Sequence, residues 1–226
     1  MLSTQDIQAL WLTVQLATLT TVLLLLLTMP LAWWLARQNS RLAVIVESIV
    51  TLPLILPPTV LGFYFLIAFS PEGILGSPWV TLTGEPLSFS FAGLVVGSMI
   101  YSMPFVVQPL QNAFRQLDLK YLETASTMGA GPQDQFFSIV IPLCRTGFIS
   151  AATMGFAHTV GEFGIILMIG GNIPGQTQVA SLVLFDHVEA LNYSSAHLIS
   201  AILMVSSLVM LIFINTLNRN AMARSQ

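Results

Sequence analysis

The sequence has 226 residues, of which 55% are hydrophobic and 8% are charged, and its formal net charge is −3. Soluble domains carry about 25% charged residues, so this composition excludes a soluble globular enzyme and indicates an all-α integral membrane protein. The single cysteine, Cys144, excludes an internal disulfide and a metal cluster built from cysteines.

Hydrophobic runs long enough to cross a bilayer, which takes roughly 20 residues of helix, occur about five times. We expect spans at about 9–36, 42–69, 89–112, 136 or 139 to 169, and 196–217. The first run is too long for the core of a signal peptide, so it is expected to be retained. No internal repeat is visible, and residues 1–226 are predicted to form a single transmembrane domain.

The second and fourth predicted spans carry residues that disturb or tighten helix packing. Three prolines lie in LPLILPPTVLG (52–62), and each removes a backbone donor. This span is therefore either broken and packed inside the bundle, or merely kinked near a helix end. In the fourth span, Gly155, Gly161 and Gly164 are expected to allow close helix packing.

The positive charges give the expected orientation. All of them fall in the turn after the first span, in the loop after the third span or its flank, and in the C-terminal tail: Arg37, Arg41, Arg115, Lys120, Arg145, Arg219 and Arg224. With five spans these three regions share one side, which the positive-inside rule makes cytoplasmic. The N-terminus and the loops at 70–88 and 170–195 are then expected outside.

The loop at about 114–142 is polar, yet it is patterned as two short helices. Apolar residues recur at spacings of three and four, which predicts one stripe on a helix: Phe114, Leu117, Tyr121, Ala125 and Met128. Gly129 and its neighbours are expected to end that helix, because glycine reaches turn conformations without steric cost. Pro132 then suits the start of a second helix. The pattern predicts a docking element at the membrane surface.

The same loop resembles the cytoplasmic loop motif of ABC importer permeases, E-A-A, three residues, G, nine residues, I-x-L-P. Its matching residues are Glu123, Ala125, Gly129, Ile139 and Pro142, while Thr124 and Ile141 depart from the pattern. The resemblance implies a coupling helix that contacts an ATPase subunit. The residues it assigns to this coupling are Lys120, Glu123, Thr124, Ala125, Met128, Gly129, Ala130 and Gly131. The alternative is a generic amphipathic loop.

Three further segments, LPLILPPTVLG (52–62), GEFG (161–164) and NIPGQT (172–177), resemble the molybdate permease subfamily. This resemblance implies a homodimer, two ATPase subunits, an external oxyanion-binding protein, and a place in the plasma (inner) membrane of a prokaryote. It implies no cofactor and no nucleic acid. Sulfate and tungstate permeases share related patterns, so the cargo stays open among these oxyanions.

The chain itself lacks an ATP-binding motif. Its only lysine, Lys120, lies in LDLKYLE without the glycines that cradle a phosphate. We therefore expect a transport subunit and not an enzyme, with ATP hydrolysed by a partner.

Ionisable residues inside the fourth span form the alternative site. His158 and Glu162 are four residues apart and share a helix face. A membrane metal-binding enzyme would use them with His187, but no third ligand is close in sequence, so no metal is predicted. We expect Glu162 to line the pathway or to be paired or protonated, since charge at membrane depth is costly.

The candidate pathway residues are Thr59, Ser98, Ser102, Thr159 and Glu162. For each hydroxyl, the alternative is a hydrogen bond back to its own helix. Glu47 is expected to pack against another helix. In the last loop, a short amphipathic helix at 179–188 is expected at the surface, and Asp186, His187 and Glu189 are expected to form plain surface.

Overall fold

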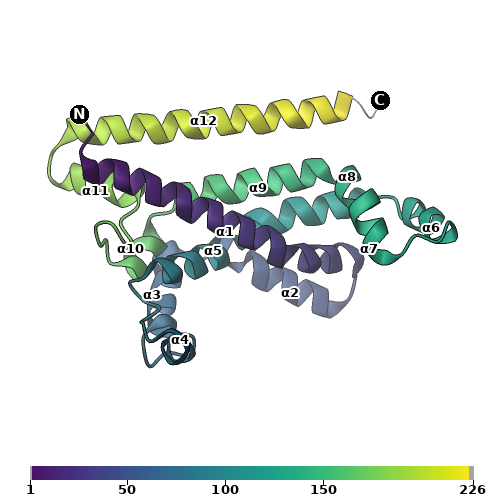
Figure 1. Ribbon diagram of the computed structural model, residues 1–226, viewed down its shortest axis with the longest axis horizontal. Helices are drawn as coiled ribbons and strands as arrows, with labels where there is room; N and C mark the ends of the chain where they lie inside the picture. Colours follow the sequence, from purple (N-terminus) through teal and green to yellow (C-terminus); the bar gives the residue numbers. More distant parts are fainter. Residues whose placement is uncertain (1, 224–226) are drawn as a thin grey trace.

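The computed structural model describes residues 2–223, without the side chains of 214 and 217–223. Its regular elements within that range are all helical. In chain order they are α1 (Thr4–Arg37), α2 (Arg41–Thr51), η1 (Leu52–Leu54), α3 (Pro58–Phe69), α4 (Gly76–Thr83), α5 (Phe91–Gln116), α6 (Lys120–Thr127), α7 (Pro132–Gln135), η2 (Phe136–Val140), α8 (Ile141–Leu143), α9 (Arg145–Val160), α10 (Gly164–Gly170), α11 (Ala180–Glu189) and α12 (Tyr193–Ala223) (Figure 1).

Three helices, α1, α5 and α12, are long and apolar enough to cross a membrane alone. Two bent pairs qualify together: Arg41–Leu54 with Pro58–Phe69, bent by 107°, and Pro132–Leu143 with Arg145–Val160, bent by 73°. Counting each pair once gives five spans, close to the predicted segments. The fourth predicted span is not one continuous helix to residue 169, however, because it bends at Cys144 and ends at Val160.

The core lies where α1, α5 and α9 pack along one another. One cluster of buried side chains includes Leu24, Leu35 and Val106, and a second includes Leu16 and Ile165. Close van der Waals packing between the helices holds these three elements together.

Glycines set how closely the helices approach. A Cβ on Gly155 would lie 2.6 Å from Val106 Cγ2, and one on Gly164 would lie 2.9 Å from Pro58 Cβ. The predicted packing role is therefore confirmed for these two. Gly161 is different, because it caps the end of α9 and a Cβ there would meet only carbonyls of its own helix.

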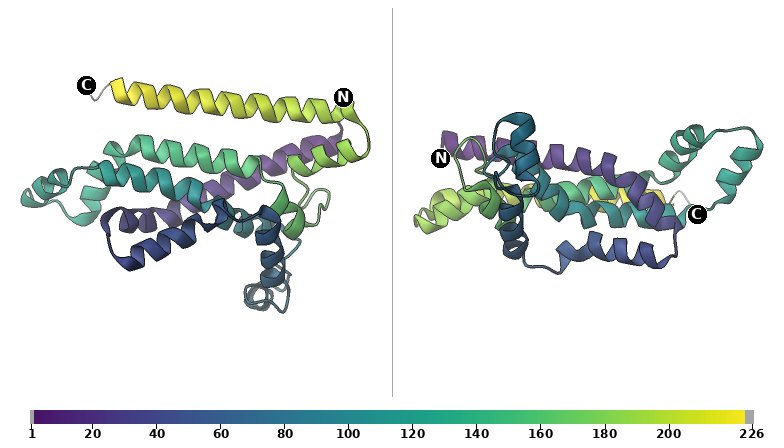
Figure 2. Two further views of the ribbon diagram at one scale, coloured as in Figure 1. Left: turned by 180° about the vertical axis from the view of Figure 1, so that it is seen from behind. Right: turned by 90° about the horizontal axis from the view of Figure 1, so that it is seen from below.

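Figures 1 and 2 show the arrangement. The helices α1, α5 and α9 follow the long axis, α12 lies on the outside against α9 and α11, and α6 and α7 project at one end. The C-terminal ends of α1, α5 and α12 and the N-terminal ends of α2 and α9 gather at that same end. The side chain of Arg219 and the whole of Arg224 lie outside the described residues.

The projecting segment differs from the predicted single stripe. Phe114 belongs to α5, where it is buried with its ring 5.2 Å from Trp33 and 5.8 Å from Phe148. The helix stops at Gln116, and α6 begins only at Lys120, whose N–H donates to Asp118 Oδ1 at 3.0 Å. The periodicity is thus interrupted between the two helices, where the Asp118 side chain makes a local hydrogen bond to the backbone.

The turn after α6 follows the prediction. Gly129 has a φ of 89°, in the left-handed region that glycine reaches without strain. Pro132 occupies the first turn of α7, as expected.

Candidate functional site

Two interruptions of helices meet in the middle of the molecule. The first lies between η1 and α3, at residues 55–57, beside Pro53 and Pro58, neither of which has an N–H to donate. The second lies between α9 and α10, at residues 161–163. Because α10 packs on α3, with Gly164 against Pro58, the two breaks lie side by side. The proline-rich span is therefore broken, as the first of its two predicted alternatives holds, with its halves bent by 107°. The second part of that alternative is wrong for the single chain, because Ile49, Ile55 and Tyr64 of this span are exposed and not packed inside the bundle.

Two hollows open at this meeting of breaks. The larger has a volume of about 590 Å³ and is lined by Pro58, Thr59, Tyr101, Ala157, His158, Gly161, Glu162, Phe163, Gly164, Leu167 and Met168. The smaller has a volume of about 320 Å³ and is lined by Pro53, Leu54, Ile55, Leu56, Pro57, Pro58, Tyr101, Phe105 and His158. We call the two together the break cavity. Its lining contains neither lysine nor arginine.

Glu162 is the carboxyl group of the break cavity. It is 3% exposed, and its Oε2 accepts a hydrogen bond from Ser98 Oγ on α5 at 2.5 Å. Its backbone carbonyl accepts from Ser181 Oγ on α11 at 2.6 Å. Among the described residues, its Oε1 is buried and has no hydrogen-bond partner. One carboxyl oxygen is thus anchored by Ser98, while the other is a buried polar atom without a hydrogen-bond partner among the described residues.

A second polar group lies one turn before Glu162, at His158 on α9. Ser102 Oγ contacts His158 Nδ1 at 2.8 Å and Thr159 Oγ1 at 3.1 Å, and Thr159 donates to the Gly155 carbonyl at 3.0 Å. The His158 ring stacks on Phe105 with a centroid distance of 3.9 Å. Packing and hydrogen bonding therefore fix the imidazole at the wall of the cavity.

The five predicted pathway residues separate into two kinds. Thr59 and Glu162 line the break cavity, whereas Ser98, Ser102 and Thr159 are buried behind its wall. Of these three hydroxyls, only that of Thr159 bonds back to its own helix, while those of Ser98 and Ser102 reach from α5 to the α9 segment. The three hydroxyls thus hold the wall in place.

The residues predicted to contact an ATPase lie at the projecting end. Lys120, Glu123, Thr124, Met128, Gly129 and Gly131 are exposed, and Ala125 and Ala130 are half-buried. Gln135 on α7 ties this segment together, because its Nε2 donates to Ser126 Oγ and to the Ala130 carbonyl, both at 2.8 Å. Sequence reasoning missed Gln135, and its place directly after the conspicuous glycine turn is the only signal that marks it.

Polar contacts at the opposite end correct one expectation. His187 Nε2 lies 2.8 Å from Asp6 Oδ1, and Asp186 accepts from Asn172 at 2.9 Å and from Gln178 at 2.8 Å. His187 and Asp186 therefore join α11 to α1 and to the preceding loop, and are not plain surface. The predicted helix itself is present as α11.

Two other predictions concern packing at the surface. Leu182 and Val183 of α11 are buried in the bundle, so this helix does not simply lie on the surface. Glu47 does pack against another helix, as expected, because its carboxylate accepts from Gln111 at 3.2 Å and from Arg115 at 3.4 Å.

No metal site is visible among residues 2–223, where no group of three His, Cys, Asp or Glu side chains is close enough to hold an ion. His187, the third ligand that a metal-binding enzyme would need, contacts Asp6 near the start of α1. It is not brought to His158 and Glu162.

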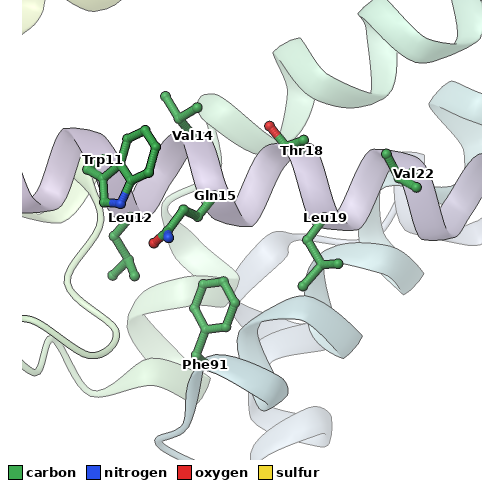
Figure 3. A pocket seen from close by; sticks show the side chains of 8 residues that line it. All are labelled: Trp11, Leu12, Val14, Gln15, Thr18, Leu19, Val22 and Phe91. Carbon is green, nitrogen blue, oxygen red and sulfur yellow. The ribbon is translucent and has the colours of Figure 1, made fainter.

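Another hollow, of about 590 Å³, lies against the N-terminal half of α1 (Figure 3). Its lining consists of Trp11, Leu12, Val14, Gln15, Thr18, Leu19, Val22 and Phe91. No side chain in it is ionisable, so it lacks the chemistry that distinguishes the break cavity.

Comparisons with known proteins now bear on this geometry. Residues 28–225 match the family model described as "Binding-protein-dependent transport system inner membrane component". The chain is 55% identical over 210 residues to the molybdenum transport system permease protein ModB of Azotobacter vinelandii, covering 93% of each chain. It is 30% identical over 187 residues to the sulfate transport system permease protein CysT of Escherichia coli, covering 83% of this chain and 67% of the relative.

Solved structures agree on the fold. A chain of a bacterial ABC transporter that imports the polysaccharide alginate superposes with a TM-score of 0.75 at 18% identity, over 97% of this chain and 80% of that one. A chain of the MetNI methionine ABC transporter, in an inward-facing conformation, gives 0.70 at 16% identity, over 95% of each chain. The fold is that of an ABC transporter permease.

Proposed function

We propose that this chain, which belongs to the family of binding-protein-dependent transport system inner membrane components, forms the translocation pathway of an ABC importer for molybdate. The observation that carries the proposal is the 55% identity to a molybdenum transport permease along 93% of both chains. The sulfate permease relative is 30% identical, so molybdate is the better supported cargo. Family and hydropathy together make the chain a multi-pass protein of the inner membrane.

We infer a single transmembrane domain over residues 1–226, with five spans, the N-terminus outside and the C-terminus in the cytoplasm. The positions of the arginines support this orientation. Helices α1, α2, α5 and α9 each carry an arginine at the end that lies where α6 projects. The segment Lys120–Thr127 is then the cytoplasmic coupling helix.

Partners complete the transporter in this proposal. Two copies of the chain pair to enclose the pathway, and two ABC ATPase subunits bind at the α6 end. An external oxyanion-binding protein docks at the opposite end. The kinds of partner agree with the solved neighbours, one of which is described in complex with a periplasmic protein.

The coupling residues are Lys120, Glu123, Thr124, Ala125, Met128, Gly129, Ala130 and Gly131. Their place on the projecting α6 and on the turn after it supports this role, since six of the eight are exposed and only Ala125 and Ala130 are half-buried. Met128 is the clearest case, with 83% of its surface exposed. Movement of α6 driven by ATP would reach the spans through α7 and η2 and through the end of α5.

The break cavity is the proposed part of the pathway within each copy. Thr59 and Glu162 face the passing oxyanion, while Ser98, Ser102 and Thr159 hold the wall. Broken helices suit a pathway because irregular backbone at membrane depth is tolerated where it lines a cavity.

ATP-driven uptake of labelled molybdate into proteoliposomes tests the proposal, using this chain with its cognate ATPase and binding protein. Inhibition by excess tungstate but not by sulfate is the expected result. Equal inhibition by sulfate would change the cargo to oxyanions in general. Absence of uptake of any oxyanion by an assembled complex would overturn the function. The alternative of a membrane metal-binding enzyme finds no supporting contact, given the separation of His187 from His158.

A further inference from the structure

The unpartnered oxygen of Glu162 has a chemical consequence for an anion that passes it. Ser98 satisfies Oε2, but Oε1 is buried and has no partner among the described residues. The break cavity contains no lysine or arginine to balance a negative charge. Ionised carboxyl groups at membrane depth are costly without such a partner.

A fully deprotonated tetrahedral oxyanion offers only acceptor oxygens, and an ionised carboxylate also offers only acceptors. The two groups would face each other with lone pair against lone pair and with like charges. In a pair of chains the pathway would contain two such carboxyl groups, one from each copy. A proton between carboxyl and oxyanion removes the conflict, because one oxygen then donates and the other accepts.

We propose that one proton is shared between Glu162 Oε1 and the oxyanion when the anion passes the break between α9 and α10. This inference rests on the proposed function. The only bond that forms or breaks is an O–H bond, and the proton is drawn from water on the entry side. Glu162 is thus a specificity-determining residue that admits an oxyanion together with a proton.

Other titratable groups face the same cavity, and their effect on the pH dependence of uptake must be distinguished from that of Glu162. They are Tyr101 from α5 and His158 from α9. The linings contributed by η1, α3 and α10 hold no ionisable side chain, and α11 reaches Glu162 through the Ser181 hydroxyl. His158 contacts Ser102. A change in its protonation would also make uptake depend on pH, so His158 needs a control variant.

The experiment measures ATP-driven uptake of labelled molybdate by the complete complex in proteoliposomes, from mildly acidic to mildly basic pH. Uptake is divided by the ATP hydrolysed at each pH, and molybdate binding to the isolated binding protein is measured in parallel. For the wild type, uptake per ATP should fall as pH rises. The steepest fall expected is about tenfold per pH unit, which is the limit when one proton is required.

The decisive variant is Glu162→Gln, whose amide can still accept from Ser98 and places a permanent N–H donor where Oε1 lies. We expect it to retain uptake and to lose the pH dependence. The variant Glu162→Asp keeps a titratable group and should keep the slope at a lower rate. His158→Gln should also keep the wild-type slope.

Three results would overturn the inference. The first is a wild-type dependence of uptake per ATP on pH in Glu162→Gln. The second is the loss of this pH dependence in His158→Gln. The third is loss of uptake in Glu162→Gln when the complex assembles and its ATPase still responds to the binding protein. Failure of the wild type to take up any oxyanion is a different result. It would overturn the proposed function and, with it, the proton requirement.

Discussion

Ser98 on α5 and Glu162 at the end of α9 lie 64 positions apart in the chain, and their side-chain oxygens are 2.5 Å apart. This contact joins a long, continuous helix to the point where another helix breaks. It fixes the orientation of a carboxyl group that faces the break cavity. The position of the proposed pathway wall thus depends on a bond between two helices.

Removing the Ser98 hydroxyl should loosen that wall. In Ser98→Ala, Oε2 of the buried carboxyl loses its partner, and a lost bond of this kind costs about 1–3 kcal/mol. We expect a lower thermal midpoint of the purified complex and uptake reduced severalfold. Ser206→Ala is the matched control, because that exposed hydroxyl only donates to Leu203 of its own helix. Equal stability and uptake in both variants would show that the contact with Glu162 has no role.

Gly129 should be required for coupling because of its backbone conformation. Its φ is 89°, and a Cβ there would meet no atom within 4 Å, so Gly129→Val strains the backbone without a clash. We expect the chain to reach the membrane but to lose ATP-driven uptake, with strain of about 1–3 kcal/mol at the turn.

Gly84 provides the control for this substitution. It has a φ of 78° and equally open surroundings, but it follows α4 in a different loop. Gly84→Val carries a similar strain and should leave uptake near the wild-type value. Normal uptake in Gly129→Val would remove the assignment of this loop to ATPase coupling.

Gln135 should hold the coupling segment in shape. Gln135→Ala removes the bonds to Ser126 and to the Ala130 carbonyl, each worth about 1 kcal/mol. We expect weaker binding of the ATPase, by up to about tenfold, with the chain still inserted in the membrane. The neighbouring exposed Gln133, changed to Ala, should bind as the wild type does. Identical affinities of the two variants would contradict the prediction.

The orientation can be tested with single cysteines in a Cys144→Ser background. A cysteine in place of Arg41 should react with an impermeant thiol reagent only from the cytoplasmic side, and one in place of Glu72 only from outside. Reaction of Arg41→Cys from outside, with Glu72→Cys protected, would reverse the topology. The two sites serve as controls for each other, since both lie at exposed positions.

Much of the architecture could be predicted from local sequence because it follows from composition and periodicity. Long apolar runs mark the spans, and the Gly129 turn and the Pro132 helix start depend on backbone preferences of single residues. Predictions were weaker where contacts with other residues determine where a helix begins and ends. The stripe from Phe114 to Met128 fits one helix by spacing. In the structure it is divided, because Phe114 is buried against Trp33 in α5 and the Asp118 side chain accepts from the Lys120 N–H where α6 begins.

The same distinction applies to the polar residues. Sequence alone identified Glu162 as a costly group at membrane depth, since its type and surroundings suffice for that conclusion. It could not pair Asp6 with His187, because those residues are 181 positions apart and meet only when α11 packs on α1.

By itself, then, the sequence determined a membrane protein of about five spans, its family, and a helix–turn–helix loop, because these depend on local hydropathy, spacing and turn chemistry. Only the tertiary structure decided that the two helix breaks meet, that Ser98 anchors one oxygen of Glu162, and that the other oxygen is buried without a hydrogen-bond partner among the described residues. These relationships arise from packing between distant segments, and no local pattern encodes which distant side chain a buried polar atom will find.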